Sequence, residues 1–274
     1  MASVPKSVSK QAEQLRETGN VAFKKERFGA AIDAYTEAIV LCPNVSVYWT
    51  NRALCHMKRN DWTRVEEDCT RAVELDNSSV KAHYMLGRAL LVRQDTTRGI
   101  KELEKALDLG RGADPSGYMI DEIWAVLAEA KYKEWEDLSD QRAWKLQCLS
   151  DACRQALRVH NFLESSPDDD ESTASKQLEY LAEVFSKAAE ADKPTEVPDY
   201  LCCKITFDIF RDPVITPCGV TYERAVILEH LQKVGNFDPL TREPLEPHQL
   251  VPNLAIKQAV QAFLSEHGWA YKTN

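Results

Sequence analysis

A spacing of 34 residues recurs through the first 110 residues and restricts the folds open to this 274-residue chain. Ala38, Ala72 and Ala106 stand 34 residues apart, and each is followed by an apolar residue. Small residues keep the same interval at a second position: Gly19, Ala53 and Gly87. A small residue at a fixed point of every unit predicts a close crossing of two helices. The spacing therefore predicts stacked helix pairs rather than one closed globule.

The repeat resembles the tetratricopeptide repeat, a unit of two antiparallel helices. Its first unit, residues 12–45, ends in the expected Pro43, whereas Asn77 and Arg111 stand at that place in the second and third units. The resemblance implies a three-repeat tetratricopeptide solenoid over residues 10–113, with the first helix of each repeat on the concave side. An irregular helical bundle is the alternative.

Polar residues fall on one face of the three first helices. With residues 12, 46 and 80 each counted as position 1 of its repeat, positions 2, 5, 6 and 9 lie on one side of an α-helix. These positions hold two cations and two carboxamides: Arg16, Asn20, Asn51 and Lys81. Arg forks a carboxylate, Lys adds a point charge and amides donate neutral hydrogen bonds, so this face predicts an anion receptor. A solvated helix face is the alternative.

This set is similar to the carboxylate clamp of chaperone-binding tetratricopeptide domains. The similarity implies that the four side chains hold the C-terminal Glu-Glu-Val-Asp of the seventy- and ninety-kilodalton heat-shock chaperones. Met85 departs from the clamp pattern, because many clamps carry a second cation at that position.

Charge and hydropathy exclude two classes of partner. The formal net charge is −9, whereas binding to phosphate backbones relies on clustered Lys and Arg, so nucleic acid is not expected. No apolar run approaches the roughly 20 residues of a membrane span, and the N-terminal residues lack the apolar core of a signal peptide. We expect a cytoplasmic protein whose eight cysteines stay reduced.

Residues 114–193 are predicted to form a helical hairpin. The segment 118–162 contains neither Gly nor Pro, and apolar residues recur in it at threes and fours. The acidic stretch SSPDDDES interrupts this pattern, and a second amphipathic helix is expected at 176–191. The apolar stripe needs a cover, either the solenoid or a second copy of the chain. The length of the faces favours a homodimer.

Residues 194–274 raise the question of zinc. A cross-braced zinc module needs two sets of four Cys or His ligands, mostly as C-x-x-C pairs. The segment contains no such pair, and its cysteines and histidines are these: Cys202, Cys203, Cys218, His230, His248 and His267. These spacings predict that there is no metal site and that the cysteines pack as small apolar residues.

The motifs of this segment resemble the U-box over residues 198–263: PDYLCCKIT, DPVITPCGVTYER, FDPLTREPL and LVPNLAIK. The U-box family keeps a RING-like shape without metal, because polar side chains hydrogen-bond the loops that zinc would otherwise hold. The candidates for that role are polar residues of the same motifs: Thr206, Asp212, Thr221, Glu223 and Asn253. The resemblance implies a small α+β, zinc-free U-box domain.

The U-box resemblance also implies a RING-type ubiquitin ligase. Such a ligase binds a ubiquitin-charged conjugating enzyme and promotes transfer without a covalent intermediate of its own. By motif, Ile205, Phe207 and Pro239 form the apolar shelf for the conjugating enzyme, and His230 lies beside it. Arg242 matches the cation that holds ubiquitin and the conjugating enzyme together in a reactive pose. In the alternative, Ile205 and Phe207 are core residues.

The order of these parts is similar to that of a family of co-chaperone ubiquitin ligases. It implies a mainly α protein that binds chaperone tails, directs ubiquitin to misfolded clients, forms a homodimer and uses no cofactor. Two alternatives stay open: a non-catalytic chaperone-binding scaffold, and a ligase that uses Cys218 as a covalent relay.

Overall fold

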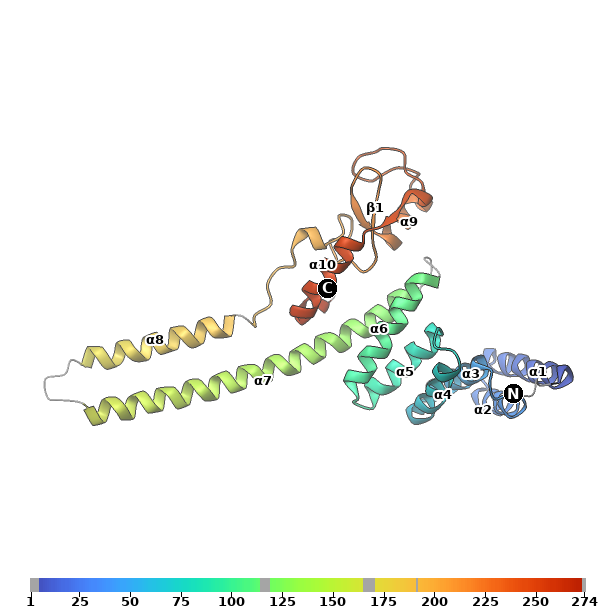
Figure 1. Ribbon diagram of the computed structural model, residues 1–274, viewed down its shortest axis with the longest axis horizontal. Coiled ribbons are helices and arrows are strands. Elements are labelled where there is room, and N and C mark those ends of the chain that lie inside the picture. Colours follow the sequence, from blue (N-terminus) through green and yellow to red (C-terminus); the bar gives the residue numbers. More distant parts are fainter. Residues whose placement is uncertain (1–4, 114–118, 165–170, 191, 273–274) are drawn as a thin grey trace. The chain divides into compact units, whose positions relative to one another are not determined.

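The computed structural model describes residues 5–113, 119–164, 171–190 and 192–272 (Figure 1). The chain divides into two compact units, residues 1–130 with 227–229 and residues 131–226 with 230–274. Residue 114, at the start of the predicted hairpin, lies outside the described residues, and the predicted boundaries 10–113, 114–193 and 194–274 stay predictions. None of the helices in the described ranges is long and apolar enough to cross a membrane.

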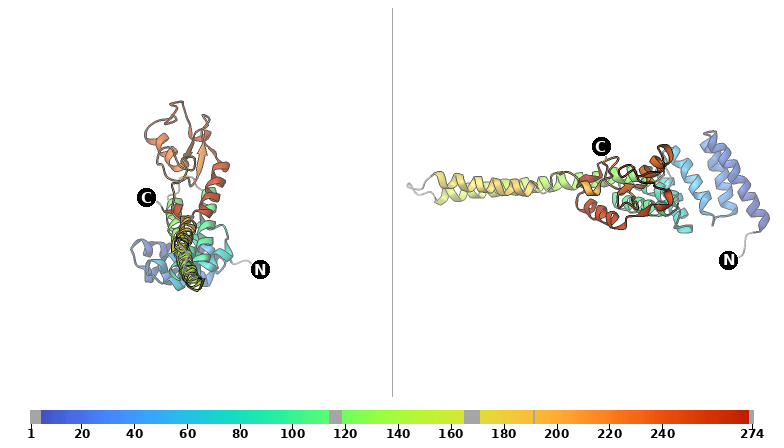
Figure 2. Two further views of the ribbon diagram at one scale, coloured as in Figure 1. Left: turned by 90° about the vertical axis from the view of Figure 1, so that its left-hand side faces the viewer. Right: turned by 90° about the horizontal axis from the view of Figure 1, so that it is seen from above.

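Six helices of the first unit form three successive pairs (Figures 1 and 2). They are α1 (Lys6–Lys24), α2 (Phe28–Leu41), α3 (Ser46–Lys58), α4 (Trp62–Leu75), α5 (Val80–Val92) and α6 (Thr96–Ala113). Each helix packs on the next, and the first helices α3 and α5 also contact each other. This arrangement confirms the predicted helical repeats.

The turn inside each pair repeats with the same 34-residue spacing. Glu26, Asn60 and Gln94 each follow the last turn of a first helix and have φ of 56°, 58° and 66°. A left-handed residue at this point lets the chain reverse and satisfies the last free carbonyls of the helix. Glycine is the usual choice there, so the repeated geometry was not evident from these three side chains.

The predicted close crossings are present inside the repeats. A Cβ on Gly19 would lie 2.5 Å from Cε1 of Tyr35, and one on Gly87 would lie 2.7 Å from Cγ of Leu103. Ala53, at the same place in the second repeat, is fully buried. Small residues are therefore required where the paired helices meet.

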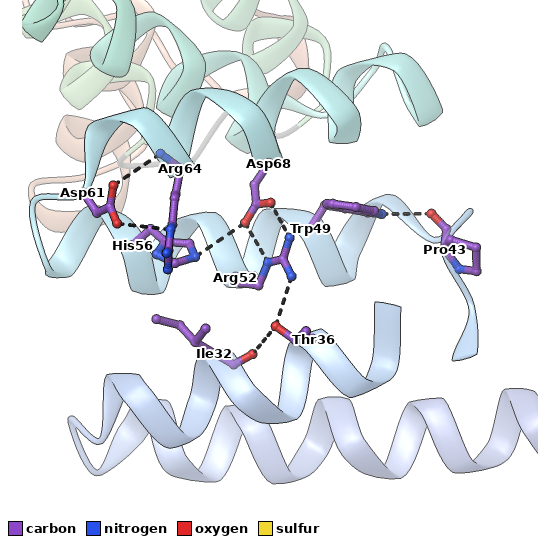
Figure 3. Close-up of polar contacts among 9 residues, drawn as sticks. All are labelled: Ile32, Thr36, Pro43, Trp49, Arg52, His56, Asp61, Arg64 and Asp68. Atoms are coloured by element: carbon purple, nitrogen blue, oxygen red, sulfur yellow. Dashed lines mark hydrogen bonds and ion pairs between the residues drawn. The ribbon is translucent and has the colours of Figure 1, made fainter. Parts of the chain in front are cut away.

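A partly buried ion pair joins three helices of the solenoid (Figure 3). Arg52 on α3 donates to Asp68 on α4 from Nε at 2.9 Å and from Nη2 at 2.7 Å. Its Nη1 donates to Oγ1 of Thr36 on α2 at 3.0 Å. In the next repeat, 34 residues after Asp68, Glu102 lies 2.6 Å from Nδ1 of buried His83. Both second helices thus use a carboxylate at one position to hold the preceding helix.

Two long helices follow the repeats: α7 (Met119–Glu164) and α8 (Glu171–Glu190). The start of α7 belongs to the first unit, where Ile123, Trp124 and Leu127 are buried. The C-terminal end of α7 runs side by side with α8 (Figure 1). Helix α8 begins five residues before the predicted 176, because the last helix breaker ahead of it is Pro167. Most of the predicted acidic interruption, residues 165–170, lies outside the described residues.

The C-terminal part is a small α+β fold. Its antiparallel sheet has the order β2-β1-β3, with β1 (Pro213–Ile215), β2 (Thr221–Glu223) and β3 (Val251–Pro252). Val214 pairs with Tyr222 on one side and Pro252 on the other. Helices α9 (Arg224–Lys233) and α10 (Leu254–Glu266) and the 3₁₀ turns η1 (Asp199–Leu201), η2 (Pro247–Gln249) and η3 (Gly268–Tyr271) complete it. The predicted fold class, mainly α with a small α+β module, is confirmed.

Candidate functional site

Two loops of the C-terminal fold have one backbone design. We call residues 202–209 the first loop and residues 237–244 the second loop. In the first, Phe207 N donates to the Cys203 carbonyl at 2.9 Å; in the second, Arg242 N donates to the Asp238 carbonyl, also at 2.9 Å. Phe207 and Arg242 both have φ of 63°. The two loops are therefore the same hairpin, placed 35 residues apart in the chain.

Apolar side chains project from both loops. Phe207 is 77% exposed and Ile205 37% exposed, which argues against a core role for either residue. Leu240, at the place in the second loop that Ile205 has in the first, is exposed, and Pro239 beside it is half-buried. Exposed apolar residues on two loops of one fold are typical of a surface that binds a protein.

Asp238 braces the second loop from inside. Its side chain is 0% exposed. Oδ1 accepts from the Tyr222 hydroxyl at 2.7 Å and from the backbone N–H groups of Leu240 and Thr241 at 2.9 and 3.1 Å, and Oδ2 accepts from Thr216 at 3.2 Å. Burial alone raises the pKa of the Asp238 carboxyl, but these hydrogen bonds to the ionised form outweigh burial and lower it.

Glu223, at the end of β2, holds the first loop and the residues that follow it. Its N–H donates to Cys203 Sγ at 3.4 Å, and its carboxylate accepts from the N–H groups of Arg211 and Asp212 at 2.8 and 3.0 Å. Burial raises the pKa of the Glu223 carboxyl. Because Tyr222 and Glu223 are neighbours on β2, this strand fixes both loops.

The other predicted bracing residues also make polar contacts. Asp212 pairs with Arg224 at 2.7 Å, Asn253 donates to Thr221 at 3.0 Å, and Thr206 accepts from the Asp208 N–H at 3.4 Å. A second bracing group was not predicted: Thr216, Tyr222 and Asp238. The Asp-Pro-Leu-Thr order was an available signal, because an Asp side chain often accepts from backbone N–H groups two or three residues ahead.

The cysteines of the module serve as contacts. Cys203 is buried, and Cys218 donates from Sγ to Glu243 at 3.0 Å. The hydrogen bond to Glu243 raises the pKa of the Cys218 thiol, so no thiolate is favoured there. Among the described residues, no cluster of three or more His, Cys, Asp or Glu side chains is placed to hold a metal ion.

Arg242 stands over an aromatic ring at the base of the second loop. Its Cζ is 5.1 Å from the ring centroid of Phe237. His230 on α9 packs edge-on against the same ring at 5.1 Å, and its Nε2 lies 3.1 Å from the Phe237 carbonyl oxygen. His230 is half-buried and packs against the base of the second loop. It therefore holds the Phe237 ring that the exposed Arg242 guanidinium covers.

The four predicted clamp residues occupy the first helices of the solenoid. Asn20 accepts from the Tyr35 hydroxyl at 2.8 Å and from Asn51 Nδ2 at 3.5 Å, which brings the two carboxamides together. Arg16 donates to Glu13 and Glu17 at 2.8 and 2.6 Å.

The two clamp cations differ in their surroundings. The hydrogen bond to Glu13 raises the pKa of Arg16, and Lys81 is exposed. Met85 is only 3% exposed, so the position at which a second cation was sought belongs to the core.

Comparison with known proteins matches residues 197–269 to the model of the U-box domain. The E3 ubiquitin-protein ligase CHIP of Arabidopsis thaliana is 62% identical over 269 residues, which cover 96% of this chain and 97% of that protein. Among solved structures, the first TPR of Spaghetti (RPAP3) bound to HSP90 peptide SRMEEVD is 31% identical, with a TM-score of 0.38, and covers 44% of this chain and 95% of that one.

A second solved structure, the TPR2B-domain:pHsp70-complex of yeast Sti1, is 26% identical. It has a TM-score of 0.41 and covers 44% of this chain and 95% of that one. The identity to the Arabidopsis ligase extends from the repeats through the paired long helices to the two braced loops. The protein is thus a member of the CHIP family of E3 ubiquitin-protein ligases.

Proposed function

We propose that this protein is a U-box ubiquitin ligase and co-chaperone. The observation that carries the proposal is the pair of braced loops, with Ile205 and Phe207 exposed on one and Arg242 on the other. A conjugating enzyme docks on Ile205, Phe207 and Pro239 through apolar contacts, with His230 holding the base of the second loop. Arg242 then hydrogen-bonds the docked enzyme and its ubiquitin.

The ligase acts by limiting how the bound thioester can move. The substrate lysine amine attacks the thioester carbonyl carbon and loses a proton to solvent. The C–S bond breaks, and the conjugating enzyme's cysteine leaves as the thiolate while an isopeptide bond forms. No bond to the ligase is made or broken. Restricting the orientation of groups that are already close can supply a large part of such a rate increase.

Reconstitution tests this function directly. The full-length protein is incubated with activating enzyme, a panel of conjugating enzymes, ubiquitin and a seventy-kilodalton chaperone loaded with an unfolded client. We expect ubiquitin on both the chaperone and the client. If no conjugating enzyme supports transfer while the chaperone still binds, the protein is a non-catalytic chaperone-binding scaffold.

We propose further that the solenoid binds the free C-terminal tails of seventy- and ninety-kilodalton heat-shock chaperones through Arg16, Asn20, Asn51 and Lys81. The contact between the two asparagines and the exposure of Lys81 support this site. Chaperone-bound misfolded proteins then become the substrates. The eight cysteines that are all free thiols support a cytoplasmic location.

Lys81→Ala is expected to weaken binding of a Glu-Glu-Val-Asp peptide about tenfold, because one charge-assisted contact to the carboxylate is lost. Titration calorimetry on the full chain measures it, with Lys101→Ala on α6 as a control for loss of one positive charge. An amidated peptide should bind the wild type at least as weakly as the free peptide binds the variant. Equal affinity for the free and amidated peptides would contradict the clamp.

A homodimer through α7 and α8 is part of the proposal. Large apolar side chains on these helices are exposed: Trp144, Phe162, Leu163, Tyr180 and Val184. Phe162 is 83% exposed, and the paired part of the helices has few buried residues in the described single chain. Such a face exceeds what a monomer usually leaves to water.

The dimer predicts a mass near twice 31.1 kDa in light scattering. Phe162→Asp is expected to shift the mass toward the monomer, because a carboxylate would be buried at the interface without a partner. Val40→Asp, at an exposed apolar residue of α2, is the matched control and should leave the mass unchanged. A wild-type chain that is monomeric at tens of micromolar would overturn this part.

A further inference from the structure

Arg88 occupies a groove position of the third repeat. It stands on α5 at the place that Asn20 has in the first repeat, two repeat lengths earlier. The same helix face holds Lys81, seven residues before it. Buried Met85 occupies the position at which many clamps carry a cation. Arg88 lies three residues after Met85, almost one helical turn further along α5.

Two aromatic rings hold the Arg88 guanidinium. Its Cζ lies 5.6 Å from the ring centroid of Tyr84 and 5.9 Å from that of Trp62. Nη1 donates to the Tyr84 hydroxyl oxygen at 3.3 Å, and that hydroxyl donates to Glu122 at 2.6 Å. Burial raises the pKa of Tyr84 to about 12, so the hydroxyl keeps its proton for Glu122. The planar side chain is therefore placed before any ligand arrives.

Arg88 differs from its neighbours in what it pairs with. Arg16, Arg52 and Arg93 each have a carboxylate partner within the solenoid. In the part of the chain that the structure describes, Arg88 has no ion pair, and its one hydrogen bond is to Tyr84. A guanidinium has five N–H donors, so most of its hydrogen-bonding capacity is open to a ligand.

We propose that Arg88 is a further anion-binding residue of the groove, which binds an acidic side chain of the ligand two or three residues before the terminal carboxylate. This inference rests on the proposed chaperone-tail function. Residues seven apart on a helix are separated by about 10 Å along the axis. Three extended peptide residues span about the same distance. In a peptide that ends in Glu-Glu-Val-Asp, the two glutamates lie two and three residues before the terminus.

The test combines protein and peptide variants in titrations with the full-length chain. Arg88→Gln, Arg88→Lys and the control Arg71→Gln on α4 are compared with wild type. The peptides are the free-carboxylate Glu-Glu-Val-Asp form, its amide, and two forms in which one glutamate is replaced by glutamine.

We expect Arg88→Gln to bind the parent peptide about tenfold more weakly than wild type, and Arg71→Gln to bind it equally well. Replacing the glutamate that Arg88 contacts should weaken the wild type about tenfold and Arg88→Gln hardly at all. Arg88→Lys should fall between them, because it keeps the charge and loses the stacked fork.

The outcomes separate this inference from the proposed function. If wild type binds the parent peptide and not the amide, while Arg88→Gln binds like wild type, the role of Arg88 is overturned and the clamp stands. If wild type binds no form, both are overturned. Should Arg88→Gln fail to fold, the peptides still decide: unchanged wild-type affinity for both glutamine forms overturns the inference.

Discussion

Asp238→Ala is expected to lower the free energy of unfolding of the C-terminal fold by about 4 kcal/mol and to abolish ubiquitin transfer. The alanine leaves two hydroxyls and two backbone N–H groups without their acceptor in a site that water does not reach. Each buried donor without a partner costs about 1–3 kcal/mol, and the terms are only partly additive. Because the second loop takes its shape from these bonds, Arg242 loses its place as well.

Asp238→Asn is the matched control for this change. The amide oxygen can still accept the three bonds that reach Oδ1, and the Thr216 hydroxyl can turn to accept from the amide nitrogen. We expect a loss of about 1 kcal/mol and partial activity. Thermal unfolding measures the stability, and hydrogen exchange at the Leu240 and Thr241 amides measures the loop itself. An Asp238→Ala protein with wild-type melting and protected amides would contradict the bracing role.

The same carboxylate makes the fold sensitive to acid. Since the pKa of Asp238 in the folded chain lies below its ordinary value of 3.8, its stabilisation is present above that value. It is lost as the pH falls through the lower, folded pKa. For each protein, the free energy of unfolding in acid is compared with its own value at pH 4. The wild type should lose more of it than Asp238→Asn does.

The solenoid was predictable because its signals are local and periodic. The interval of 34 residues alone predicts the helix pairs and the close crossings at Gly19 and Gly87. Met85 was harder to place. Its position on the helix predicted a side chain that faces the groove. An apolar side chain next to the core is instead buried, because burial lowers its free energy.

The C-terminal loops were predictable in position but not in their relation to each other. CCKITFDIF and FDPLTREPL have only one identical residue at matching places, Thr206 and Thr241. What they share is a set of backbone hydrogen bonds and a left-handed sixth residue, and such features leave little trace in side-chain identity. The Asp-Pro-Leu-Thr order signals the two backbone bonds to Asp238, but its bonds to Thr216 and Tyr222 were hidden, because these residues reach it from the distant β1–β2 hairpin.

Ile205→Ala and Arg242→Ala are expected to fail at different steps of ubiquitin transfer. Ile205 offers a partly exposed apolar side chain for docking, so its loss should weaken binding of the free conjugating enzyme about tenfold. Arg242 is exposed over the Phe237 ring, where it can make hydrogen bonds with the docked pair. Its loss should leave the binding of the free conjugating enzyme within about twofold of wild type and slow transfer at saturation about 100-fold.

Two measurements separate the steps. Titration of the uncharged conjugating enzyme gives the docking affinity, and single-turnover discharge of the charged enzyme to free lysine, with ligase in excess, gives the transfer rate. Raising the ligase concentration should rescue Ile205→Ala and not Arg242→Ala. Arg242→Lys should regain only part of the rate, because an ammonium cannot make the two parallel bonds of a guanidinium. Equal rescue of both alanine variants would mean that Arg242 contributes to docking alone and does not orient the thioester.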